Sequence, residues 1–260
     1  PTLADTLNAF PDLIEDAGYQ YRTIAPDEVD AERLQRQATR AFYLPYVQAM
    51  STREANELTR FVEAGGLVIA DLRPAVADEH GKPHARSPLD EVFGVEQSTE
   101  QAKPIRGVVT VELPVGAFRG RLGLRFSDAS LRVTAGQAHA TVTAPPLLHN
   151  TTAQESARAV IINRYGRGTA VLLNFSVNQY GVEARASQKT RRLLRELLST
   201  HGISPDVKLS PSLPDTHLYR FRQGVARYVG LLRNPPGVNV PGHDHGARDI
   251  ARFRPEQFEI

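Results

Sequence analysis

A group of charged and polar side chains accompanies the most apolar run of the chain, residues 67–72. Its members are Asp71, Arg73, Asp78, Glu79, His80 and Lys82. Carboxylates, an imidazole and cations in one loop could bind a small polar ligand or exchange protons with it. If the apolar run is a parallel strand, the loop lies at the carboxyl edge of a sheet, where open α/β folds bind ligands. We therefore predict a ligand or interface loop here, against the alternative of a solvated connection.

Several catalytic mechanisms lack the residues that they need. The chain has no cysteine, which removes disulfides, thiolate metal ligands and a cysteine nucleophile. It also has no Gly-x-Ser-x-Gly segment to present a serine nucleophile. Glycoside hydrolysis needs two carboxylates about 5–9.5 Å apart, and no spacing among the many Asp and Glu residues selects a pair. We predict no catalytic residue and no cofactor.

One pattern near the C-terminus resembles a metal site. His243 and His245 are two residues apart, and Asp244 and Asp249 are close in sequence. In an extended segment both imidazoles could face one ion. The ligands are too few and lie in a stretch rich in Gly and Pro, so we predict no metal.

The residues around the polar group predict a strand, a helix and a second strand. Residues 41–47 are apolar and aromatic, and a proline near their end stops the strand. Ser51 and Glu54 are spaced as a reciprocal capping box, which predicts the start of a helix. The helix carries one apolar stripe: Ala55, Leu58, Phe61 and Val62. A Gly-Gly pair ends it, and residues 67–72 then predict a fully buried parallel strand reached by a right-handed crossover.

The run LPYVQAMSTREANELTRFVEAGGLVIADLRPAVADEHGKP, followed by LDEVFGV, resembles the β-galactosidase trimerisation domain. A Gly-Arg-Gly turn at residues 166–168 adds to the resemblance, which covers roughly residues 1–203. This family is a flavodoxin-like module, similar to class I glutamine amidotransferases, within multidomain glycosidases and related carbohydrate-active proteins. The resemblance implies a non-catalytic role in assembling subunits or shaping a cleft. It also implies that the glycosidase residues of a parent protein lie outside this chain.

The rest of the chain predicts a doubly wound α/β sheet with antiparallel additions, followed by a small β segment. The expected elements are helices near residues 3–17 and 186–201, a strand at 19–24, period-two strands within 107–143, and a hairpin over 158–175. We predict an α/β domain over residues 1–203, a proline-containing linker over 204–216, and a hairpin with a tail over 217–260 that begins a small β-domain.

Composition limits the partners. The formal net charge is +2, and the basic face of the helix at 186–201 lacks interleaved aromatics, so we expect no nucleic acid. No apolar run approaches the roughly 20 residues of a membrane helix. We expect a soluble protein, with the cytoplasm favoured, that binds a second copy, other domains of a parent protein, or a carbohydrate. The alternative function is a small-molecule-binding enzyme or sensor, which requires the polar group to converge on one cleft.

Overall fold

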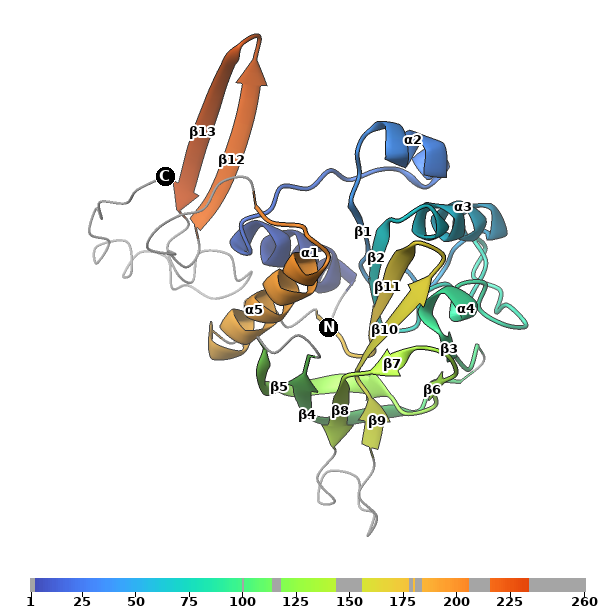
Figure 1. The fold of residues 1–260 in the computed structure, drawn as a ribbon. Coiled ribbons are helices and arrows are strands. Elements are labelled where there is room, and N and C mark those ends of the chain that lie inside the picture. The colour runs from blue at the N-terminus through green and yellow to red at the C-terminus, as the bar shows by residue number, and fades with distance from the viewer. Residues whose placement is uncertain are drawn as a thin grey trace. The chain divides into compact units, whose positions relative to one another are not determined.

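The computed structural model describes residues 3–99, 101–113, 118–143, 156–177, 180, 184–205 and 216–233 (Figure 1). The chain divides into two compact units. The first unit is Pro1–Leu7 with Thr23–Gln179, and the second is Asn8–Arg22 with Tyr180–Ile260. Each unit is described by itself below.

The first unit is built on a mixed sheet with the strand order β1-β2-β11-β10-β7 (Figure 1). Its strands are β1 (Ala41–Leu44), β2 (Leu67–Asp71), β11 (Gly168–Leu173), β10 (Val160–Tyr165) and β7 (Gln137–Ala138). β2 pairs in parallel with both β1 and β11, whereas β10 is antiparallel to β11 and β7. Every residue of β2 and β11 is buried, as expected for central strands.

Helix α3 (Thr52–Glu63) begins as the sequence predicted. The Ser51 hydroxyl accepts the backbone N–H of Glu54, and the Glu54 carboxylate accepts the backbone N–H of Ser51 at 2.8 Å. This capping box satisfies N–H groups that have no partner within the helix. All members of the predicted apolar stripe are buried.

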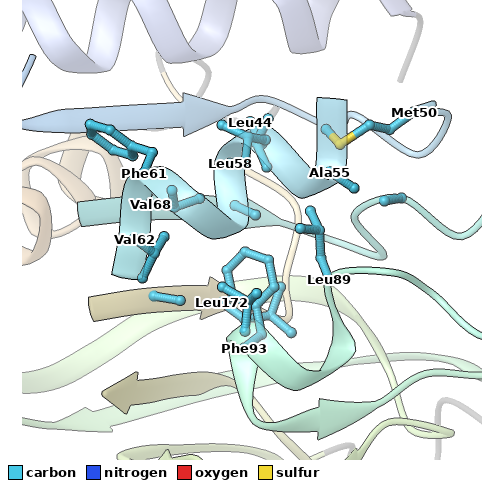
Figure 2. Packing of buried hydrophobic residues seen from close by; sticks show 14 of the residues in the cluster. Leu44, Met50, Ala55, Leu58, Phe61, Val62, Val68, Leu89, Phe93 and Leu172 are labelled. Carbon is cyan, nitrogen blue, oxygen red and sulfur yellow. The ribbon is translucent and has the colours of Figure 1, made fainter. Parts of the chain in front are cut away.

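A hydrophobic core lies between one face of the sheet and two helices, α3 and α4 (Asp90–Phe93). Figure 2 shows the side chains of Leu58 and Val62 from α3 near Val68 of β2, with Phe93 of α4 near Leu172 of β11. Full burial of an aliphatic or aromatic side chain contributes roughly 1.5–3 kcal/mol, so this cluster contributes substantially to the stability of the first unit.

The predicted hairpin before the end of this unit is confirmed as β10 and β11, joined at Gly166 and Arg167. Its glycines are required by a close approach to the end of α3. A Cβ on Gly168 would lie 2.1 Å from the Val62 carbonyl oxygen, and one on Gly166 would lie 2.6 Å from the Glu63 Cα. The Arg167 N–H in turn donates to the Glu63 carbonyl at 3.0 Å.

An antiparallel sheet with the order β5-β4-β8-β9 accounts for the predicted period-two region. It consists of β5 (Arg119–Asp128), β4 (Pro104–Glu112), β8 (Ala140–Thr143) and β9 (Ser156–Arg158). The other elements of this unit are η1 (Pro26–Glu28), α2 (Ala31–Arg36), β3 (Val95–Glu96) and β6 (Arg132–Val133). The prediction of an α/β fold with antiparallel additions is therefore confirmed.

The second unit contains the last part of α1 (Leu3–Asp16), α5 (Ala184–Thr200) and a hairpin of β12 (Thr216–Gln223) with β13 (Ala226–Arg233). Arg195 of α5 donates to the Ala17 carbonyl at 2.9 Å and to the Asp16 carbonyl at 3.1 Å. A cation is favourable there because the carboxyl end of a helix carries partial negative charge. The predicted helix at 186–201 and the hairpin after residue 217 are both present.

One predicted element is wrong. Residues 19–24 form no strand; they are an irregular connection in which the Tyr19 hydroxyl donates to the Ile203 carbonyl at 3.2 Å. Residues 20–23 are exposed, so this segment lacks the buried face that makes a strand favourable.

The predicted linker falls largely on residues 206–215, and the histidine pattern at 243–245 falls in the tail; both lie outside the described residues.

We predict that Gly168→Ala lowers the free energy of unfolding by about 3 kcal/mol or more, because the new methyl group meets backbone that cannot rotate away. The matched control is Gly120→Ala on β5, where the nearest atom to an added Cβ is Phe118 Cζ at 3.6 Å, an ordinary contact. Urea unfolding followed by circular dichroism measures both. Equal stabilities for the two variants would contradict the close approach seen at Gly168.

Candidate functional site at the carboxyl edge of the sheet

The loops that follow β1 and β2 form an ordered backbone structure, which we call the edge platform: residues 47–50, 75–78 and 82–84. Its backbone hydrogen bonds run from Ala75 N to Val47 O (2.9 Å), Ala77 N to Gln48 O (3.0 Å), Met50 N to Ala77 O (2.9 Å), His84 N to Val76 O (3.0 Å) and Asp78 N to Lys82 O (2.8 Å). The carboxyl edge of the sheet is therefore extended by paired backbone.

The buried carboxylate of Asp71 accepts hydrogen bonds from the loops beside this platform. Its side chain is fully buried at the end of β2, where one carboxylate oxygen accepts the Tyr46 N–H and the other accepts the Val177 N–H at 3.5 Å. It thus joins the loops that follow β1, β2 and β11. Burial raises the pKa of Asp71 to about 7, because the ionised form is poorly solvated there and the backbone donors compensate only in part.

Arg73 faces a different partner. Its Nη1 lies 2.7 Å from Oδ2 of Asp128, at the end of β5, and both side chains are largely buried. The Ser130 hydroxyl and the Lys103 N–H also donate to Asp128. Burial opposes ionisation of Asp128, but the hydrogen bonds from Ser130, Arg73 and Lys103 outweigh it and lower the pKa below the ordinary value.

Asn174 completes the connection to the antiparallel sheet. It follows β11, and its side-chain amide donates to the Asp128 carbonyl at 2.8 Å and to the Arg158 carbonyl at 2.7 Å. Its oxygen accepts the Asp128 N–H at 3.2 Å. The carboxyl edge of the mixed sheet is therefore joined by side chains to β5 and β9.

The backbone around these anchors is strained. Tyr46, Arg73 and Ala75 have φ angles of +51°, +59° and +53°, in the left-handed region that side chains disfavour. Such residues cost of order 1–3 kcal/mol each and persist only where their surroundings hold them. Here the holding contacts are the Asp71 carboxylate, the Asp128 carboxylate and the Val47 carbonyl.

The loop at residues 78–82 is organised by its own first residue. Oδ1 of Asp78 accepts the backbone N–H groups of His80 at 3.0 Å and Lys82 at 2.9 Å. These bonds, that from Lys82 first, lower the pKa of Asp78. The side chains of Glu79, His80 and Lys82 are exposed.

An open hollow of about 660 Å³ lies beside this loop. It is lined by Asp78, Lys82, Pro83, His84, Ala85, Gln97, Ser98 and Thr99. Of the predicted site residues only Asp78 and Lys82 belong to this lining. Asp71 and Arg73 are used in the buried contacts described above, and Glu79 and His80 are on the same loop without lining the hollow. The predicted polar group is therefore divided between a buried anchor and an exposed loop.

The sequence prediction missed the second side of the hollow. Gln97, Ser98 and Thr99 follow β3, and nothing in their spacing relates them to residues 78–85. The LDEVFGV segment directly before them resembles the family, but its residues do not indicate a binding surface. Within the described residues, no three His, Asp or Glu side chains are grouped to hold a metal ion.

The family model of the β-galactosidase trimerisation domain matches residues 25–204. The chain belongs to this family. The match includes the edge platform, the hollow and the described sheets of the first unit. A comparison with curated proteins found no match. Among the described helices of this trimerisation-domain chain, none is long and apolar enough to cross a membrane.

Solved structures with a similar fold include several β-galactosidases. The enzyme from Bacillus circulans sp. alkalophilus is 14% identical over 88% of this chain, with a TM-score of 0.67. Those from Rahnella sp. R3 and Halorubrum lacusprofundi are 16% and 18% identical over 88% and 78% of the chain, with TM-scores of 0.65 and 0.56. The matched part is 31%, 31% and 28% of those three chains, so the present chain spans under a third of their length. At these identities the likeness shows a shared fold.

We predict an unusual pH dependence of stability from Asp71. A carboxyl group whose pKa rises from 3.8 to about 7 on folding stabilises the folded state most below pH 4 and loses that contribution as the pH rises to about 7. The Asp71→Asn variant stays neutral, so its stability relative to wild type should increase over this range, by up to about 4 kcal/mol. Urea unfolding at a series of pH values measures the difference.

Asp128→Asn is the control, because the effect of this substitution on stability should change with pH in the opposite direction. The lowered pKa of Asp128 stabilises the fold above its ordinary range, and this contribution is lost as the pH falls. Asp128→Asn should therefore cost most at neutral pH and least in acid. Parallel pH profiles for wild type and Asp71→Asn would show that Asp71 does not titrate as its burial implies.

Proposed function

We propose that this chain is a non-catalytic module that assembles the subunits of a carbohydrate-active, β-galactosidase-like protein and borders its binding cleft. The observation that carries the proposal is the family match over residues 25–204, which includes the whole carboxyl edge of the sheet. The lack of cysteine supports the non-catalytic part, because an amidotransferase nucleophile has no residue to supply it. Catalytic residues of the parent then lie outside this chain.

We further propose that the mixed sheet of the first unit has a flavodoxin-like fold of the glutamine-amidotransferase type. β1 and β2 are parallel neighbours, and α3 connects them across one face. β11 continues the parallel order on the other side of β2. This arrangement supports a βαβ unit at the centre of a parallel sheet, with β10 and β7 as antiparallel additions.

The surface that we assign to assembly is the edge platform with the adjoining Tyr46. Tyr46 is 38% exposed, although its backbone N–H is held by the buried Asp71. Tyrosine is enriched among the residues that dominate binding energy at interfaces. A surface fixed before binding loses little conformational entropy on association. The partner is a second copy of the chain, and other domains of the parent protein are the alternative occupant.

The test is the mass in solution of the full chain, measured by sedimentation equilibrium over a range of concentrations. We expect masses above the 28.6 kDa of one chain, approaching a trimer. Tyr46→Ala should weaken association at least tenfold, because it removes an anchor without touching the buried contacts of Asp71. Tyr228→Ala, at an exposed tyrosine of β13, is the matched control and should leave the mass unchanged. A monomer at every concentration would contradict the assembly role.

A further inference from the structure

The solvent-facing side of the antiparallel sheet β5-β4-β8-β9 gathers arginine side chains (Figure 1). Residues of β4 alternate between exposed and buried, so one face of this sheet packs inward and the other meets water. The strand register then decides which residues share the outer face. We call this outer surface the arginine face; its described residues are Arg106, Thr110, Glu112, Arg119, Arg121, Phe126, Thr141 and Arg158.

One row of the arginine face crosses all four strands. Arg121 of β5 is opposite Thr110 of β4, Thr110 is opposite Thr141 of β8, and Thr141 is opposite Arg158 of β9. Neighbouring strands are about 4.8 Å apart, so the backbones of the two end arginines are separated by roughly 14 Å. The row therefore presents a cation at each end and two hydroxyl groups between them.

The fold itself does not neutralise these cations. The cross-strand neighbours of Arg121 and Arg158 are threonines, and neither arginine forms an ion pair with a described residue. Arg119 is opposite Glu112, which is the exposed acid among the described residues of this face. The exposed arginines therefore outnumber the acids, and the face has an excess of positive charge although the whole chain is nearly neutral.

The kinds of residue on this face are those of an interface. The basic residues within the four strands are all arginine, with no lysine. Arginine and aromatic residues are enriched at protein interfaces, whereas lysine is depleted. Phe126 is 37% exposed, and the guanidinium carbon of Arg106 lies 5.4 Å from the centre of its ring. Such a cation–π contact orients the arginine beside an apolar surface that a partner can cover.

The ligand chemistry that matches this face is a set of carboxylates. A guanidinium group forms paired hydrogen bonds with a carboxylate or a phosphate. Single-stranded nucleic acids are bound through several stacked aromatics, and the described part of this face has one exposed aromatic, Phe126. An extended polypeptide with acidic residues four positions apart spans about 13 Å, close to the distance between the end arginines of the row. Protein carboxylates therefore fit better than nucleic acid phosphates.

We propose that the arginine face is a docking surface for an acidic, extended segment of another protein. Carboxylates of the partner bind Arg121 and Arg158, its backbone and side chains meet the two threonines of the row, and an apolar side chain covers Phe126. This face shares no residue with the edge platform or the hollow. The proposal therefore goes beyond assembly and does not depend on it.

The test uses the full chain and a fluorescein-labelled peptide of about twelve residues, which is long enough to cross the sheet when extended. The peptide alternates glutamate with threonine around one central leucine. Fluorescence anisotropy at about 0.15 M salt, where exposed charges are screened beyond about 8 Å, should give saturable binding. The same peptide with glutamine in place of every glutamate is the matched probe, and it should bind at least tenfold more weakly.

Variants of the protein locate the binding surface. Arg121→Gln and Arg158→Gln should each weaken binding about tenfold, the loss typical of a charge-assisted hydrogen bond. The double variant should lose about a hundredfold, because sites this far apart act additively. Glu112→Gln removes the opposing charge and should tighten binding about threefold. Arg227→Gln, at an exposed arginine of β13, is the matched control and should bind as wild type does.

Circular dichroism checks the fold of each variant, and all of these substitutions change exposed side chains. The proposal is overturned if the glutamine peptide binds as tightly as the glutamate peptide, or if Arg121→Gln and Arg158→Gln both bind as Arg227→Gln does. It is also overturned if oligothymidylate of the same length binds more tightly than the acidic peptide, because the face would then select phosphate. A monomeric chain that binds the peptide would contradict assembly and leave this proposal intact.

Discussion

The Asp71 carboxylate accepts the backbone N–H groups of Tyr46 and Val177, and in this way it holds together the loops that follow β1, β2 and β11. The rest of the carboxyl edge depends on this contact. The left-handed backbone of Tyr46 is kept in place by it, and the backbone pairing of the edge platform begins directly beyond it. The Arg73–Asp128 ion pair then joins the same edge to the antiparallel sheet. Two buried acids therefore fix a surface that hydrophobic packing alone would leave loose.

A fixed polar edge suits a module that works through its surface. One hydrophobic core of the first unit lies between a face of the sheet and helices α3 and α4, and the loops at the carboxyl end of the strands carry the polar groups. That end provides two different surfaces. The edge platform, with the exposed Tyr46, is suited to another protein surface, whereas the hollow beside residues 78–82 is concave and polar.

Local signals in the sequence predicted much of the fold. The capping box of Ser51 and Glu54, the apolar run of β2 and the glycine turn of the β10–β11 hairpin each act over a few residues, and all are present. The strand expected at 19–24 failed because residues 20–23 are exposed and pair with no sheet. The site was predicted only in part: Asp71 and Arg73 were identified as important, but their burial and the pairing with Asp128 depend on contacts across the fold. Gln97 was missed for the same reason, since its position beside the hollow is set by hydrogen bonds to Asp90 and Pro74.

Hydrogen–deuterium exchange of the full chain, compared between dilute and concentrated samples, tests most directly whether the edge platform is the assembly surface. Self-association through this surface predicts slower exchange at high concentration in peptides covering residues 45–50 and 75–84, with little change in β12 and β13. Protection confined to other regions, in a sample that does associate, would contradict the account.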